Sequence, residues 1–149
     1  MIYLITGGVR SGKSRYAEAV AKYFSDEVLY IATLQPSDEE MKTRIAKHRS
    51  RRPKTWRTLE VELELSQTIQ DSLEKVILVD CLSGFVSNAL LEYKGLEEEA
   101  VIERVLEAVE ELTNILQTST QTIIIVTNEV GYGVVPEHPL GRWFRDALG

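Results

Sequence analysis

The sequence predicts an α/β protein in which helices flank a mostly parallel β-sheet. Apolar runs of strand length alternate along the 149 residues with segments whose apolar side chains recur at helical spacing. The first apolar run, residues 2–6, predicts a buried strand, and it leads directly into a glycine-rich segment and then into a segment with helical spacing. Strand, glycine-rich loop and helix in this order are the setting of a phosphate-binding loop.

The glycine-rich segment matches the complete pattern of such a loop. Gly7 and Gly12 permit backbone conformations in which successive N–H groups wrap an anion at the positive end of the next helix. Lys13 is expected to reach the terminal phosphates, and Ser14 to ligate Mg²⁺. A turn without chemical role is the alternative, which the flanking strand and helix disfavour. The pattern predicts a P-loop NTPase-like fold whose loop consists of Gly7, Gly8, Val9, Arg10, Ser11, Gly12, Lys13 and Ser14.

Composition indicates one soluble domain. The chain is 44% hydrophobic and 27% charged, and no apolar stretch is long enough for a membrane span. Residues 1–6 lack the basic lead-in of a signal peptide, and Cys81, the single cysteine, cannot form an internal disulfide. We therefore expect a cytoplasmic protein.

Charge is distributed unevenly. The net charge of −6 argues against general nucleic-acid binding, yet residues 42–57 hold 8 of the 17 basic residues and no acidic one. A solvated helix end and loop would explain this segment. A phosphate-binding patch beside the nucleotide site is the interpretation that we favour.

The helices and strands expected in the first half follow from apolar spacing, a capping box and a helix-breaking proline. Residues 15–24 predict a helix with Ala17, Val20, Ala21 and Phe24 on its inner face, and residues 28–33 predict a strand. A capping box at residues 37–40 begins a helix that carries Met41, Ile45 and His48 on one face. Pro53 prevents that helix from continuing.

The second half repeats the alternation. Residues 56–61 predict a short strand, Leu65, Ile69 and Leu73 a helix, residues 76–80 a strand and residues 82–91 a helix. The longest helix is expected at 96–117, with an apolar stripe formed by Val101, Val105, Ala108, Leu112 and Ile115. A buried strand at 122–127 precedes a glycine-rich loop at 128–136, and Pro139 suits the first turn of a last helix.

Asp80 ends an apolar strand, so its carboxylate is expected at the carboxyl edge of the sheet, where α/β proteins bind ligands. There it could hold the Mg²⁺ that Ser14 also contacts. A turn-forming aspartate is the alternative.

His48 has two interpretations. A histidine in the last helical turn often complements the helix dipole. The neighbouring arginines favour a second one, in which they neutralise phosphate charge while the neutral imidazole attacks phosphorus. We interpret His138 as structural or surface-exposed and Cys81 as a small buried residue.

Three blocks spread over residues 1–149 resemble one family, the bifunctional adenosylcobinamide kinase and adenosylcobinamide-phosphate guanylyltransferase of cobalamin assembly. The first block is residues 5–15, which include the phosphate loop. The second comprises Arg44, Ile45, His48, Arg52, Pro53 and residues 56–60. The third comprises residues 126–131, Val135, Pro136, Arg142 and residues 144–146.

The resemblance implies two reactions at one site. A terminal phosphate from ATP or GTP passes to the hydroxyl of adenosylcobinamide, and GTP then donates GMP to adenosylcobinamide phosphate through a guanylylated histidine, which by motif position is His48. We expect Lys13 to be the other catalytic residue. Further nucleotide contacts implied by the resemblance are Thr33, Leu34, Gln35, Arg49, Ser50, Arg51, Arg52, Glu60 and Asp80, the last through Mg²⁺ shared with Ser14.

The family is cytoplasmic, and similar proteins assemble as homotrimers. Similar proteins also continue for roughly another helix and strand past the position of Gly149. Two other functions stay open. One is a simple phosphate-loop kinase or nucleotidase in which His48 is only a helix-end residue. The other is a nucleotide-binding module that is catalytically silent because it lacks the last helix and strand of similar proteins.

Overall fold

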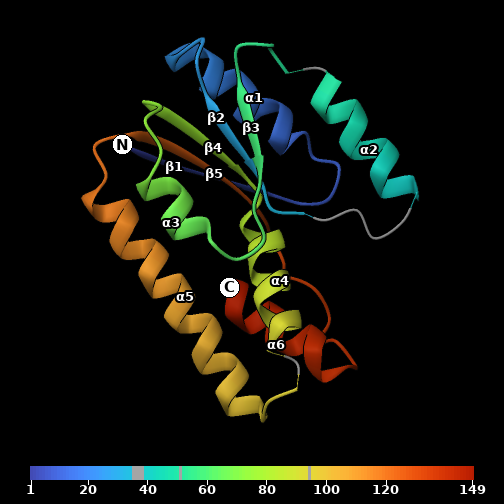
Figure 1. The fold of residues 1–149 in the computed structure, drawn as a ribbon. Helices are drawn as coiled ribbons and strands as arrows, with labels where there is room; N and C mark the ends of the chain where they lie inside the picture. The colour runs from blue at the N-terminus through green and yellow to red at the C-terminus, as the bar shows by residue number, and fades with distance from the viewer. Residues whose placement is uncertain (35–38, 51, 94) are drawn as a thin grey trace.

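Five parallel strands form a single sheet in the computed structural model, which describes residues 1–34, 39–50, 52–93 and 95–149 (Figure 1). The strand order is β1-β5-β4-β2-β3, and every neighbouring pair runs parallel. The strands are β1 (Ile2–Gly7), β2 (Leu29–Ala32), β3 (Arg57–Glu60), β4 (Val76–Asp80) and β5 (Thr122–Asn128). Because all strands run the same way, their carboxyl ends meet at one edge of the sheet.

Helices cover both faces of this sheet, which confirms the predicted α/β class. α1 (Lys13–Phe24) packs on one face against β1, β4 and β5. The other face is covered by the group α3 (Leu65–Gln70), α4 (Leu82–Glu92), α5 (Glu98–Thr118) and α6 (Pro139–Leu148). No helix of the described part is long and apolar enough to cross a membrane.

Successive side chains of the central strands point to opposite faces of the sheet, so the hydrophobic core has two parts. Ile77 and Val79 of β4 face the four-helix side, whereas Val76 and Leu78 face α1. All four are at most 3% exposed, as expected for a parallel strand covered on both faces. The central strands are thus held firmly, and Asp80 at the end of β4 has a defined position.

β1 differs from the buried strand that its apolar run predicted. It lies at the edge of the sheet, and Ile2 and Leu4 are 44% and 62% exposed. A continuous apolar run is typical of a central strand, but strand order depends on the whole chain. The prediction of a strand is confirmed, and the prediction of its burial is wrong.

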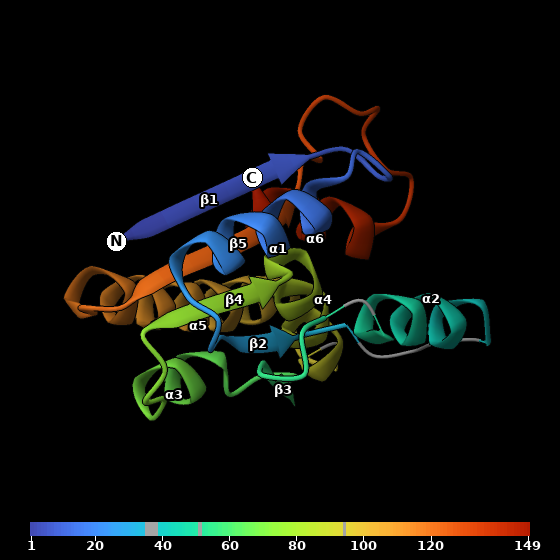
Figure 2. The same cartoon turned by 90° about the horizontal axis from the view of Figure 1, so that it is seen from above.

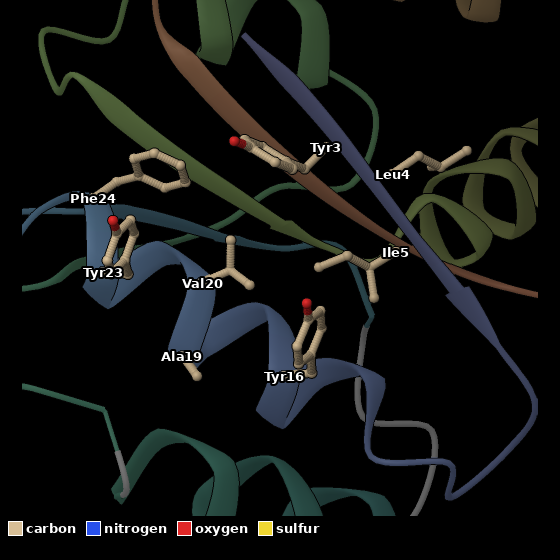
Figure 3. Close-up of a pocket in the computed structure, with 8 residues that line it drawn as sticks. All are labelled: Tyr3, Leu4, Ile5, Tyr16, Ala19, Val20, Tyr23 and Phe24. Carbon is tan, nitrogen blue, oxygen red and sulfur yellow. The ribbon is translucent and has the colours of Figure 1, made fainter.

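An apolar groove runs between this edge strand and α1. Its lining includes Tyr3 and Ile5 of β1 and Tyr16, Val20 and Phe24 of α1 (Figure 3). The rings of Tyr3 and Phe24 lie 5.4 Å apart between centroids. Ala17 and Ala21 are fully buried, whereas Phe24 is 37% exposed because it lies at the margin of this groove.

The remaining helices match their predicted places with one exception. In α5, Val101, Val105 and Leu112 are buried as the apolar stripe predicts. α3 ends at Gln70, and Leu73 is 96% exposed, so its predicted place in that helix is wrong. The helical spacing continued by chance into the turn that leads to β4.

α2 (Glu39–Ser50) stands to one side of the sheet, beyond the carboxyl ends of the strands (Figure 2). Its predicted extent is confirmed, while residues 37 and 38 of the proposed capping box lie outside the described residues. Ile45 is half-buried, and the side chains of residues 40–42, 44, 47 and 48 are not described. The backbone therefore places His48 in the last turn of α2.

Candidate nucleotide and metal site

The glycine-rich segment forms the predicted connection between β1 and α1. Gly12 precedes the helix with φ 90°, a left-handed conformation that suits glycine, and Arg10 also has a positive φ of 59°. A Cβ on Gly7 would lie 2.9 Å from Ser11 Oγ. The loop thus turns tightly and leads its backbone toward the N-terminus of α1, where backbone N–H groups and the helix dipole favour an anion.

Lys13 begins α1 and lies close to this loop. Its Nζ donates to the carbonyl oxygen of Gly8 at 3.2 Å, and Ser11 N donates to the same oxygen at 3.3 Å. The ammonium group is thereby held beside the backbone that would surround a phosphate. Its position agrees with the predicted contact to terminal phosphates.

Ser14 and Asp80, the predicted metal pair, are brought together. Ser14 Oγ donates to Asp80 Oδ1 at 3.2 Å, although the two residues come from α1 and the end of β4. A hydroxyl and a carboxylate are hard oxygen ligands, and Mg²⁺ is usually held by one or two such groups together with phosphate oxygens and water. Within the described residues no cluster of three or more His, Cys, Asp or Glu side chains forms a metal cage. The pair suits a metal that arrives with a nucleotide.

Tyr30 is a site residue that the sequence analysis missed. Its hydroxyl donates to Asp80 Oδ2 at 2.5 Å, and its side chain is 1% exposed. Burial, together with the negative charge of Asp80, raises the pKa of Tyr30 above its usual range, so the phenol stays protonated. A tyrosine inside a buried apolar strand needs a partner for its hydroxyl, and this rule was a usable signal.

Arg52 lies over the face of the Tyr30 ring. Its guanidinium carbon is 3.3 Å from the centroid of Tyr30, and the ring of Trp56 stacks at 6.5 Å between centroids. Arg52 follows α2 by two residues, so the chain after that helix returns to the sheet here. The predicted nucleotide contact of Arg52 is untested, but the residue does lie near Asp80 through Tyr30.

Arg49 and Glu60 also approach each other. Arg49 Nη1 lies 3.7 Å from Glu60 Oε1, and both side chains are largely exposed. An exposed ion pair of this kind contributes little to stability. It does show that the end of α2 and the end of β3 face one another at the carboxyl edge of the sheet.

The hydroxyl of Thr33 is hydrogen-bonded within the fold. Its hydroxyl donates to the carbonyl of Cys81 at 2.6 Å and accepts from Cys81 N at 3.0 Å, and the residue is 1% exposed. Leu34 is 44% exposed and Ser50 is exposed. Thr33 therefore joins the ends of β2 and β4. Gln35 and Arg51 lie outside the described residues.

Cys81 and His138 have the structural roles that their sequence positions predicted. Cys81 is 4% exposed, and burial raises the pKa of its thiol, so it is a poor nucleophile. His138 is exposed and precedes α6, where its carbonyl oxygen accepts from Gly141 N at 3.1 Å.

This parallel sheet, with a phosphate loop between β1 and α1 and a carboxylate at the end of β4, defines a nucleotide-binding α/β protein of the P-loop NTPase-like class. The family described as cobinamide kinase / cobinamide phosphate guanyltransferase matches residues 3–149. The chain belongs to this family.

Similar proteins support the assignment. The bifunctional adenosylcobalamin biosynthesis proteins CobU of Escherichia coli K12 and of Salmonella typhimurium LT2 are each 41% identical over 157 residues, covering 100% of this chain and 86% of the relative. The bifunctional adenosylcobalamin biosynthesis protein CobP of Pseudomonas aeruginosa PAO1 is 45% identical over 148 residues, covering 98% of this chain and 82% of the relative. The predicted family, fold and bifunctional enzyme class are confirmed. The roles of individual residues stay predictions.

Proposed function

We propose that this chain phosphorylates adenosylcobinamide and then transfers GMP to the product, with both reactions at the loop between β1 and α1. The observation that carries the proposal is the 3.2 Å contact between Ser14 and Asp80. It supports a single place where the phosphates of a nucleotide would meet the loop and the metal ligands, and Tyr30, which contacts both Asp80 and Arg52, links the segment after α2 to that place. The family membership supplies the two activities.

In the kinase reaction, the acceptor hydroxyl attacks the γ-phosphorus of ATP or GTP. A new oxygen–phosphorus bond forms, the bond to the β-phosphate oxygen breaks, and the hydroxyl proton leaves to solvent. The N–H groups of the loop hold the phosphates, and Lys13 neutralises the charge that develops on them. Positioning and charge neutralisation are the main requirements of such a transfer.

Ser14 and Asp80 would hold Mg²⁺ together with the nucleotide. When bound, the ion neutralises phosphate charge and orients the phosphate chain. Asp80 is kept in place by two hydrogen bonds, one to each carboxylate oxygen. The chain thus offers a preformed pair of oxygen ligands at the start of α1.

In the guanylyl transfer, a ring nitrogen of His48 attacks the α-phosphorus of GTP. A nitrogen–phosphorus bond forms and pyrophosphate leaves. A phosphate oxygen of adenosylcobinamide phosphate then attacks the same phosphorus, which releases His48 and gives adenosylcobinamide-GDP. Arg49 in the last turn of α2, together with Arg51 and Arg52, which follow the helix in the sequence, would support the transfer by neutralising phosphate charge.

We also place this chemistry in the cytoplasm, and we propose a homotrimer that binds no nucleic acid. The single cysteine Cys81, which is buried and forms no disulfide, supports the first statement, and the net charge of −6 supports the last. The trimer rests on family resemblance. Sedimentation of the purified chain tests it, and a monomer at micromolar concentration would contradict it.

The test uses the two histidines of the chain. Incubation with GTP labelled in its α-phosphate and Mg²⁺ should give a protein-bound GMP that is labile in acid and stable in base. His48→Ala should abolish the adduct and leave phosphate transfer to adenosylcobinamide at least partly intact. The matched control His138→Ala should form the adduct normally, because His138 is exposed at the start of α6.

Other outcomes separate the alternatives. Phosphate transfer without any adduct would identify a kinase with a single activity. GTP binding by a folded protein without turnover of either kind would identify a silent nucleotide-binding module. Either result would overturn the proposed two-step function.

A further inference from the structure

Tyr30 occupies the middle of the site without belonging to any of the motifs that define it. It lies in β2, is 1% exposed, and faces the core on the α1 side of the sheet. Its hydroxyl donates to Asp80 Oδ2 at 2.5 Å, while Ser14 Oγ donates to Asp80 Oδ1 at 3.2 Å. The two oxygens of one carboxylate therefore have separate donors, which restricts rotation of the carboxylate.

The ring of Tyr30 makes a second contact, with Arg52. The guanidinium carbon of Arg52 lies 3.3 Å from its centroid, a short cation–π contact. Arg52 Nε is buried and has no hydrogen-bond partner in the described part of the chain. The aromatic face is thus a principal contact of this half-buried arginine.

Sequence position makes the second contact important. Arg52 lies two residues beyond the end of α2, the helix whose last turn contains His48. Tyr30 connects this segment to the carboxylate beside the phosphate loop through one rigid side chain. A substitution of Tyr30 would therefore affect Asp80 through loss of the hydroxyl and Arg52 through loss of the ring.

We propose that Tyr30 is a positioning residue for both reactions: its hydroxyl fixes the Asp80 carboxylate for the metal-bound triphosphate, and its ring holds Arg52 and the segment that follows α2. The inference rests on the proposed function, because it takes Ser14 and Asp80 as the pair that holds Mg²⁺. Tyr30 itself contacts neither phosphorus nor the acceptor in this proposal.

The hydroxyl and the ring can be separated by mutation. Tyr30→Phe removes the bond to Asp80 and keeps an aromatic face for Arg52. A hydrogen bond to a charged group affects an equilibrium by about 10- to 100-fold. Tyr30→Phe should therefore raise the Mg²⁺ concentration that half-saturates binding of a fluorescent GTP analogue by about 10-fold or more. Binding of the analogue without metal should change less than about 2-fold, since it does not use Asp80.

Tyr3→Phe is the matched control. It removes the same hydroxyl from β1, where the group donates to the Met1 sulfur at 2.8 Å and, among the described residues, makes no contact with Asp80. Its Mg²⁺ midpoint should equal that of the wild-type protein. Melting temperatures of both variants verify that each is folded at the assay temperature.

The ring is tested by GMP-adduct formation at saturating Mg²⁺. Tyr30→Phe should form the adduct at nearly the wild-type rate, whereas Tyr30→Leu should form it about 10-fold more slowly, since the cation–π contact of a half-buried arginine is lost. If Tyr30→Leu does not fold, Tyr30→Met, which also lacks the aromatic face, takes its place. Arg52→Met loses its charge near the phosphates as well as the ring contact, so its adduct rate should fall at least as far, with an unchanged Mg²⁺ midpoint.

A folded Tyr30→Phe with a wild-type Mg²⁺ midpoint would overturn the role of the hydroxyl. A wild-type adduct rate in a folded Tyr30→Leu or Tyr30→Met would overturn the role of the ring, whatever the rate of Arg52→Met. Failure of the proposed function looks different, because the wild-type protein itself would then show no Mg²⁺-dependent binding or no adduct.

Discussion

The hydroxyl of Ser14 lies 3.2 Å from a carboxylate oxygen of Asp80, although 66 residues separate them in the chain. The contact arises because β1 and β4 end at the same edge of the sheet with β5 between them. α1 starts at that edge and packs back across β5 and β4, which brings its second residue to the end of β4. The metal pair is therefore a direct product of parallel topology.

Asp80→Asn should abolish most of the Mg²⁺-dependent activity while the fold is retained. The amide oxygen can still accept from Tyr30, but the negative charge for the metal is lost. Even outer partners of metal sites contribute about 10- to 100-fold, so a loss of about 100-fold or more in kcat is expected. Steady-state kinetics over a Mg²⁺ series measures it. Asp26→Asn, an exposed aspartate, is the control, and full activity of Asp80→Asn would exclude the metal role.

Lys13→Ala should weaken both reactions, because one ammonium group serves the phosphates in each. Loss of one preorganised electrostatic contact costs about 100- to 1,000-fold in rate. Parallel assays of phosphate transfer and GMP-adduct formation measure the two effects. Lys22→Ala on the exposed side of the same helix should leave both rates unchanged. A variant at Lys13 that loses only one activity would contradict a shared loop.

Gly12→Ala should destabilise the protein, whereas Gly8→Ala should not. Gly12 has φ 90°, which an L side chain adopts at a cost of about 1–2 kcal/mol. For a chain of this size the expected fall in Tm is about 2–8 °C. A Cβ on Gly8 meets no atom within 4 Å of the described structure, so its Tm should change by less than about 1 °C. Thermal unfolding followed by circular dichroism compares the two, and equal Tm values would refute the assigned loop conformation.

Glu74→Gln should destabilise the protein in a pH-dependent way. Glu74 accepts from Arg57 Nε at 2.6 Å and from Arg57 Nη2 at 3.0 Å, and this contact lowers the pKa of the Glu74 carboxyl. A lowered pKa means that the stabilisation is present above the ordinary value of 4.5 and is lost as pH falls through the folded-state value. Because Arg57 is half exposed, we expect about 1 kcal/mol at pH 7.

Urea unfolding at pH 7 and at pH 3 measures this difference. Glu107→Gln is the matched control, since Glu107 pairs with Arg104 at 3.0 Å with both side chains more than half exposed. That control should lose less than about 0.5 kcal/mol at either pH. A loss for Glu74→Gln that is equal at both pH values would show that packing, and not the ion pair, is responsible.

Much of the fold was predictable because it depends on local pattern. Strands such as 76–80 and 122–127 are apolar runs of strand length between turn residues, and Pro139 begins α6 as its fixed φ allows. Two errors came from the same source. The burial of β1 and the extent of the helix at Leu73 depend on neighbours that the local pattern does not specify.

In the site, too, some features depend on local sequence and others on tertiary packing. The spacing of Gly7, Gly12, Lys13 and Ser14 determines by itself that a phosphate loop forms, because the turn and the helix start are made by consecutive residues. Only the tertiary structure decided that Tyr30 joins Asp80 to Arg52, since these residues come from β2, β4 and the segment after α2. Contacts between distant segments depend on strand order and on packing across the sheet, and no local pattern encodes either.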